Sequence, residues 1–180
     1  MVKYFGLIFM MMMLVLSGCN TKSESLNNLN HEIIKYGINT SIPQIDDLII
    51  SYVHVVLPPK DMGKNNLGDV NTVVVSYTEE KGKLIKLRSD QKEKNDIIIL
   101  YGPFEANSIL NLSISNTENS IDGASIKTTH GKEMYYKKNN NNLILLANHK
   151  KMSFIIEGQI TDKYTEERYV SIMDDILSSN

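Results

Sequence analysis

The pattern of hydrophobic and polar positions divides the chain into an apolar start, a long middle part and an amphipathic end. From Ile45 onward, short runs rich in Ile and Val alternate with turn residues, a pattern typical of β-strands. We expect strands at residues 48–57, 72–78, 83–88, 96–101, 109–114, 124–129, 131–138, 143–147 and 152–160, with a loop at 60–69. Because these runs follow one another through short connections, they predict a mostly antiparallel, curved sheet of about seven to nine strands.

Turn residues predict how neighbouring strands are joined. The polar residues 79–82 predict a hairpin between strands 72–78 and 83–88. The asparagine block 139–142 predicts a loop, and residues 148–150 predict a tight hairpin turn before the last strand.

A first helix is expected before the sheet. Leu26, Leu29 and Ile33 recur at helical spacing and predict a helix over residues 25–36. Gly37 provides a plausible stop signal at its C-terminal end.

A second helix is expected at the end of the chain, where Thr165 is a suitable N-cap. Its apolar side chains form one stripe: Tyr169, Ile172, Met173, Ile176 and Leu177. Burial stabilises such side chains by about 1.5–3 kcal/mol each, so we expect the helix to pack on the sheet. A helix that binds a partner is the alternative. The fold class expected is therefore α+β, with helices at both ends.

The start of the chain has the three parts of a secretory signal. Lys3 is the positive region, residues 4–16 form an apolar stretch of 13 residues, and Ser17 and Gly18 are small. A membrane-spanning helix needs about 20 apolar residues, which argues against an uncleaved anchor.

Leu16, Ser17, Gly18 and Cys19 close this apolar stretch and resemble the lipobox of bacterial lipoproteins. The resemblance implies cleavage before Cys19 and attachment of a diacylglycerol to its thiol. It also implies a location on the outer face of the cell membrane. An ordinary buried thiol is the alternative, but Cys19 lies between an apolar run and a polar stretch.

The resulting domain organisation is a signal peptide at residues 1–18, a lipidated tether at 19–25 and one extracytoplasmic domain at 26–180. Cleavage leaves 162 residues, enough for one domain with a hydrophobic core. It removes only Lys3 among the charged residues, so the net charge becomes −3 and gives no electrostatic reason to bind nucleic acid. Cys19 is the only cysteine, so its acylation leaves no thiol for a disulfide or a metal site.

The second half of the chain shows a further resemblance. The pattern comprises Ile121-Asp122-Gly123-Ala124, the pair Tyr135-Tyr136, Leu143-Ile144-Leu145-Leu146, Asn148-His149-Lys150, Phe154-Ile155-Ile156-Glu157-Gly158 and a helix after Thr165-Glu166-Glu167. It is similar to a bacterial extracytoplasmic domain family of unknown function. Its members occur on lipoproteins, sporulation-associated envelope proteins and anti-sigma-type membrane proteins. The family's usual Trp before the polar turn is Leu145 or Leu146 here. The resemblance supplies no catalytic residues.

The titratable residues do not form a recognisable catalytic or metal-binding motif. The histidines are His31, His54, His130 and His149, and the adjacent acidic pairs are Asp46-Asp47, Glu79-Glu80, Glu166-Glu167 and Asp174-Asp175. No two histidines have a spacing that favours zinc ligation. Neighbouring carboxylates on a strand point to opposite faces and therefore do not aim at one site. We expect no cofactor, no metal and no catalytic residues.

Two weaker features leave alternatives open. Lys137-Lys138 and His149–Lys151 would form one basic patch facing anionic lipid if they lay together, and are otherwise solubilising charges. The many tyrosines suit cross-strand packing, although a carbohydrate-binding surface is an alternative.

These observations predict a membrane-anchored, non-catalytic binding or accessory module of the cell envelope. The alternative is an envelope hydrolase with an unrecognised active site. Converging polar side chains with a nucleophile–base contact would favour the hydrolase. A shallow apolar groove would favour binding.

Overall fold

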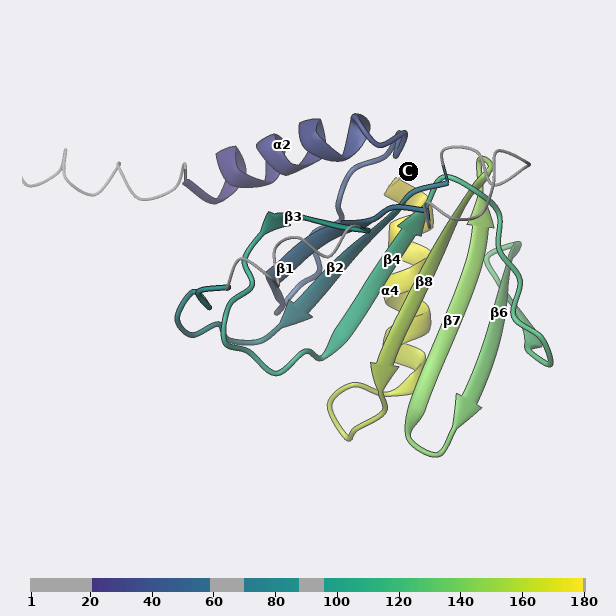
Figure 1. Ribbon diagram of the computed structural model, residues 1–180. Coiled ribbons are helices and arrows are strands. Elements are labelled where there is room, and N and C mark those ends of the chain that lie inside the picture. The colour runs from purple at the N-terminus through teal and green to yellow at the C-terminus, as the bar shows by residue number, and fades with distance from the viewer. Residues whose placement is uncertain (1–20, 59–69, 88–95, 180) are drawn as a thin grey trace, which may run out of the picture.

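The computed structural model describes residues 21–58, 70–87 and 96–179, which form one open antiparallel sheet with two helices (Figure 1). The strands are β1 (Ile49–Val56), β2 (Thr72–Thr78), β3 (Ile97–Tyr101), β4 (Leu110–Ser115), β5 (Ser125–Thr129), β6 (Lys132–Asn139), β7 (Asn142–His149) and β8 (Met152–Gln159). The helices are α2 (Thr21–Ile34) and α4 (Glu166–Ser179). The strand order is β3-β1-β2-β4-β8-β7-β6-β5. This confirms the predicted α+β class.

The register of the sheet gathers the apolar residues on one face. Val53 pairs with Val75, Val75 with Leu112, Leu112 with Ile156, and Ile156 with Leu145. All five side chains are completely buried. Because successive side chains of a strand alternate between faces, the intervening residues lie on the opposite face.

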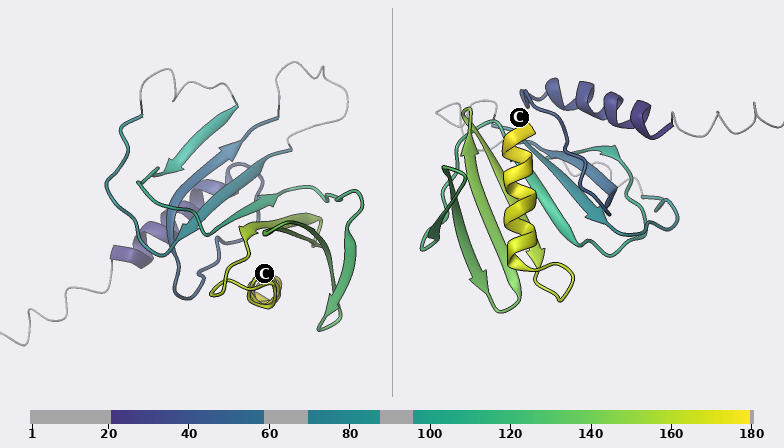
Figure 2. Two further views of the ribbon diagram at one scale, coloured as in Figure 1. Left: turned by 90° about the horizontal axis from the view of Figure 1, so that it is seen from below. Right: turned by 180° about the vertical axis from the view of Figure 1, so that it is seen from behind.

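Helix α4 lies in the hollow of the curved sheet, against β7 and β8 (Figure 2). Its predicted apolar stripe is buried in full, which confirms that it docks. The Thr165 hydroxyl accepts a hydrogen bond from the Arg168 backbone N–H at 3.3 Å, so it caps the helix as expected.

Helix α2 joins the same core and lines a groove together with α4. Leu29 and Ile33 are buried with Ile38, which follows the helix. The backbone N–H groups of Gly37 and Ile38 donate to Ile34 and Ile33 at 3.0 and 3.4 Å, and Gly37 has φ of 76°. This arrangement is a Schellman motif, so the predicted stop at Gly37 is confirmed.

The helix begins at Thr21 rather than at residue 25. Each residue added to an existing helix gains one hydrogen bond, so polar residues can extend a helix whose apolar positions are already packed. Most of the stretch predicted as a tether, 19–25, is therefore helical.

The predicted strand at 83–88 and its hairpin with β2 are wrong. β1 and β4 occupy both edges of β2, which leaves no edge for a further partner. Leu84 instead forms a single bridge with Phe104. Arg88 and the predicted loop at 60–69 lie outside the described residues.

Two asparagine- and lysine-containing turns are tighter than expected. Asn139 and Asn142 pair with each other, so the predicted loop is a turn of two residues in which Asn140 has φ of 53°. The last hairpin turns at Lys150 and Lys151, which both have positive φ, as type I′ turns require.

The face of the sheet opposite α4 is crossed by the connection from β4 to β5. The Asn119 side chain donates to the Ser153 hydroxyl, and the Asn148 side chain donates to the Asn119 carbonyl at 2.9 Å. This crossing carries the chain past β8, β7 and β6 to the outer edge of the sheet, where β5 lies (Figure 1).

Candidate functional site

The predicted lipidation site, Cys19, and the lipobox residues Leu16, Ser17 and Gly18 lie outside the described residues. Only Asn20 separates Cys19 from the first residue of α2. Any lipid on Cys19 would therefore be attached next to a helix that is packed on the domain.

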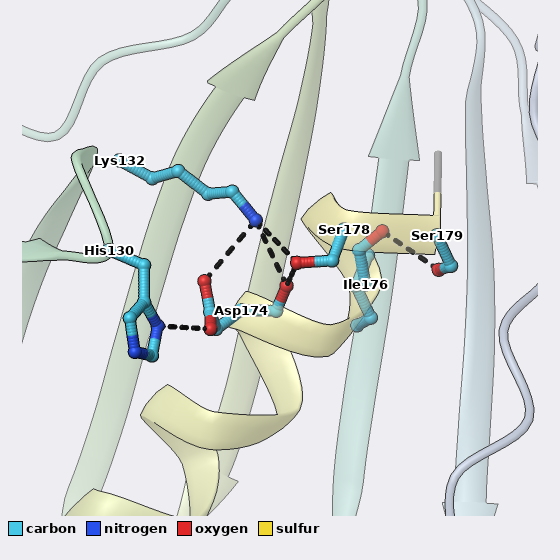
Figure 3. A network of polar contacts seen from close by, with 6 residues as sticks. All are labelled: His130, Lys132, Asp174, Ile176, Ser178 and Ser179. Carbon is cyan, nitrogen blue, oxygen red and sulfur yellow. Dashed lines mark hydrogen bonds and ion pairs between the residues drawn. The ribbon is translucent and has the colours of Figure 1, made fainter.

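The most connected polar cluster joins the β5–β6 turn to α4 (Figure 3). His130 Nδ1 lies 2.6 Å from Asp174 Oδ2, and Lys132 Nζ lies 3.3 Å from Asp174 Oδ1. Lys132 Nζ also donates to the Ser178 hydroxyl at 2.6 Å, and this hydroxyl donates to the Asp174 carbonyl at 2.8 Å. The contacts of Lys132 with Asp174 and Ser178 thus join residues that are separated by 42 and 46 positions in the sequence.

Asp174 is the centre of this cluster, and its side chain is only 15% exposed. The hydrogen bond with His130 lowers the pKa of Asp174, and the hydrogen bond from Lys132 lowers it further. A carboxylate in the second half of a helix interacts unfavourably with the helix dipole. The two basic side chains compensate for this position.

The arrangement does not place a base beside a nucleophile. The Ser178 hydroxyl accepts a hydrogen bond from Lys132, and the Lys132 ammonium group is paired with the Asp174 carboxylate. His130 Nδ1 is turned to Asp174. The cluster therefore fastens the β5–β6 turn onto α4. Sequence analysis missed it because no local pattern links residues so far apart.

The other predicted histidines lie apart from one another. His31 is exposed on α2, and His149 ends β7. His54, on β1, stacks on Tyr52 with ring centroids 4.6 Å apart, and burial lowers its pKa. Across the described ranges, no three His, Cys, Asp or Glu side chains gather as metal ligands would.

The two predicted basic clusters do not form one patch. Lys138 pairs with Leu143 at one end of β7, whereas His149 lies at the other end. At about 3.3 Å per residue, the clusters are roughly 20 Å apart. They are separate charges at opposite ends of the sheet.

A groove of about 420 Å³ lies between α2, the segment 41–46 and α4. Its lining combines apolar residues (Leu26, Ile42, Pro43, Ile45, Ile172 and Ile176) with polar residues (Asn30, Ser41, Gln44, Asp46, Arg168, Asp175 and Ser179). Arg168 Nη2 donates to the Asp46 carbonyl at 3.5 Å. A lining that mixes apolar and polar groups suits binding of a partly apolar ligand.

A second groove, of about 680 Å³, lies between β3 and the segment that was wrongly predicted as a strand. Its lining is almost entirely apolar: Leu84, Ile85, Leu87, Ile97, Ile98 and Ile99, with Lys86 and Gly102. In the sequence, this segment is marked by lysines interspersed with apolar residues at positions 81–87.

In the described part of the chain, no helix is both long and apolar enough to span a membrane. No family model, curated protein or solved structure matches the chain.

Proposed function

We propose that this chain is a lipid-anchored protein of the outer face of the cell membrane, and that its domain binds a partner in the cell envelope without catalysing a reaction. The observation that carries the proposal is the sequence Leu16-Ser17-Gly18-Cys19 directly after an apolar run of 13 residues. A diacylglycerol provides two acyl chains, whereas a single chain binds a membrane only reversibly.

The arrangement of the domain supports a binding role. In its most connected polar cluster, His130 and Lys132 both contact Asp174 and link the β5–β6 turn to α4. One of its two grooves has an almost entirely apolar lining, and the other has a mixed apolar and polar lining. Apolar grooves with few polar groups are typical of binding surfaces.

The anchor is tested by Cys19→Ala in cells that are fed radiolabelled palmitate. The variant should lose the label and leave the membrane fraction, because no other thiol can accept the lipid. Ser17→Ala is the matched control, because alanine is also small and should leave cleavage and labelling intact. A Cys19→Ala protein that stays membrane-anchored would overturn the proposal.

The binding role is tested by photo-crosslinking on intact cells. A photoreactive residue in place of Gln44, which is exposed in the first groove, should trap an envelope component. The same residue in place of Ser171, on the exposed side of α4, serves as the control. Identical products from both positions, or turnover of an envelope substrate by the purified protein, would contradict the proposal.

A further inference from the structure

We propose that the segment Lys81–Leu87, together with the neighbouring edge strand β3, is a membrane-contacting surface that lies on anionic lipid headgroups beside the anchor. This inference rests on the proposed function, because it takes the lipid on Cys19 as the point of attachment. It adds a second contact with the bilayer and thereby an orientation of the domain.

The segment is held in a defined position on the domain. The Gly82 backbone N–H donates to the Glu105 carbonyl at 2.7 Å, the Glu105 N–H donates to the Lys83 carbonyl at 2.9 Å, and the Ile85 N–H donates to the Pro103 carbonyl at 2.9 Å. These bonds fix the backbone, so the direction in which the side chains project is part of the fold.

Lys81 fastens the start of the segment to the end of β3. Its ammonium group donates to the Tyr101 hydroxyl at 2.5 Å and lies 4.4 Å from the centre of the Phe104 ring. A cation over an aromatic face is attracted by the ring's quadrupole. The ammonium group of Lys81 therefore helps to hold the segment against the sheet.

The fixed segment projects apolar side chains into solvent. Leu84 is 58% exposed and Ile85 is 42% exposed, and both border the apolar groove against β3. Large apolar side chains that remain exposed next to one another mark an interaction site. Bilayer interfaces accept such side chains when basic residues accompany them.

Basic residues accompany these side chains. Lys83 and Lys86 are exposed and lie on either side of Leu84 and Ile85 in the sequence. Glu105, which is paired with the segment through its backbone, and the exposed Glu80, which precedes Lys81, offset two of the three lysines. The remaining positive charge favours a surface rich in anionic lipid, which attracts basic segments placed within a Debye length.

The position of the anchor points to the same side of the molecule. The step from Cys19 to Thr21 spans at most about 7 Å, so the lipid must lie close to the start of α2. The start of α2 and the segment 81–87 project on the same side of the domain in all three views (Figures 1 and 2). A bilayer that holds the lipid would therefore lie on the side of the domain from which the segment 81–87 projects.

The test uses the full-length lipoprotein, purified from membranes and reconstituted into phosphatidylcholine vesicles with or without phosphatidylglycerol. Once Cys19 is acylated, Leu84→Cys carries the only free thiol and can be labelled with an environment-sensitive fluorophore. Ile126→Cys is the matched control, because Ile126 is 61% exposed but lies on β5, at the opposite edge of the sheet.

The label at position 84 should shift to shorter emission wavelength and be quenched by brominated lipid, more strongly in the vesicles that contain phosphatidylglycerol. The label at position 126 should show neither effect. Adding Lys83→Glu and Lys86→Glu should remove the quenching while the protein remains attached through its lipid. Equal behaviour of the labels at 84 and 126 would overturn the inference. A crosslink from position 84 to an envelope protein, without quenching by lipid, would also overturn it.

Mass spectrometry of the purified protein shows whether Cys19 carries a diacylglycerol, and so it tests the anchor separately from the membrane-contacting surface. If Cys19 carries no diacylglycerol, the proposed function fails. The same fluorophore is then placed in a Cys19→Ser background, and the vesicles are added to the protein. Quenching at position 84 by vesicles with phosphatidylglycerol would still support the surface, and its absence would overturn it.

Discussion

The phenol ring of Tyr169 lies directly against the backbone of Gly158, so that a β-carbon at Gly158 would come within 2.6 Å of the ring. The Tyr169 hydroxyl donates a hydrogen bond to the Gln159 carbonyl at 2.9 Å, and burial raises the pKa of Tyr169 to about 12. The docking of α4 on β8 thus depends on a position without a side chain.

Gly158→Ala should lower the free energy of unfolding by about 1–3 kcal/mol, the usual cost of overpacking a core. The cost arises because the added methyl group would force the fully buried Tyr169 ring to shift. Chemical denaturation measures the effect. In a Tyr169→Leu background the same substitution should cost less, because a smaller side chain leaves room. Additive losses in the double variant would contradict this explanation.

Ile172→Asp should destabilise the domain by more than about 2 kcal/mol, because it would place a charge without a partner in the core. Ile172 is 3% exposed and belongs to the stripe of α4 that faces the sheet. Ser171→Asp is the control, since Ser171 is exposed on the same helix. If thermal melts of the two variants coincide, the helix does not dock as described.

Asp174→Asn should make the protein less stable than the unaltered protein at neutral pH. In acid, the two proteins should be equally stable. The hydrogen bond with His130 and then Lys132 hold the pKa of Asp174 below its ordinary value of 3.8. The ionised carboxylate therefore stabilises the fold above pH 3.8, and this contribution disappears as the pH falls through the lowered pKa. Denaturation of both proteins across this range should show their stabilities converging. A constant difference would mean that the charge of Asp174 is not responsible.

His54→Phe should make the protein less sensitive to mild acid. Burial lowers the pKa of His54 from 6.5, so below that pH the unfolded chain takes up a proton that the folded chain resists. Stability contributed by neutral His54 is thus lost as the pH falls from 6.5 toward the lowered pKa. Phenylalanine can still stack on Tyr52 and does not titrate. Melting temperatures of the two proteins should diverge as the pH falls below 6.5. Parallel pH profiles would contradict the assignment.

Local patterns were sufficient for the elements with strong periodicity. The α4 stripe, its cap at Thr165 and the stop at Gly37 depend on neighbours within two turns, so the sequence alone identifies them. The segment 83–88 has the same kind of pattern, yet it is not a strand of the sheet. The segment could pair with β2 only if β2 had a free edge, and β1 and β4 already occupy both of its edges.

The sequence by itself determined the alternation that makes a sheet, the amphipathic final helix and the resemblance of residues 16–19 to a lipobox, because each of these depends on residues close together in the chain. Only the tertiary structure decided the strand order and the meeting of His130 and Lys132 with Asp174. It also decided that Leu84 and Ile85 remain exposed. The physical reason is that pairing and exposure depend on which edges and faces other segments already occupy, and that competition involves the whole chain at once.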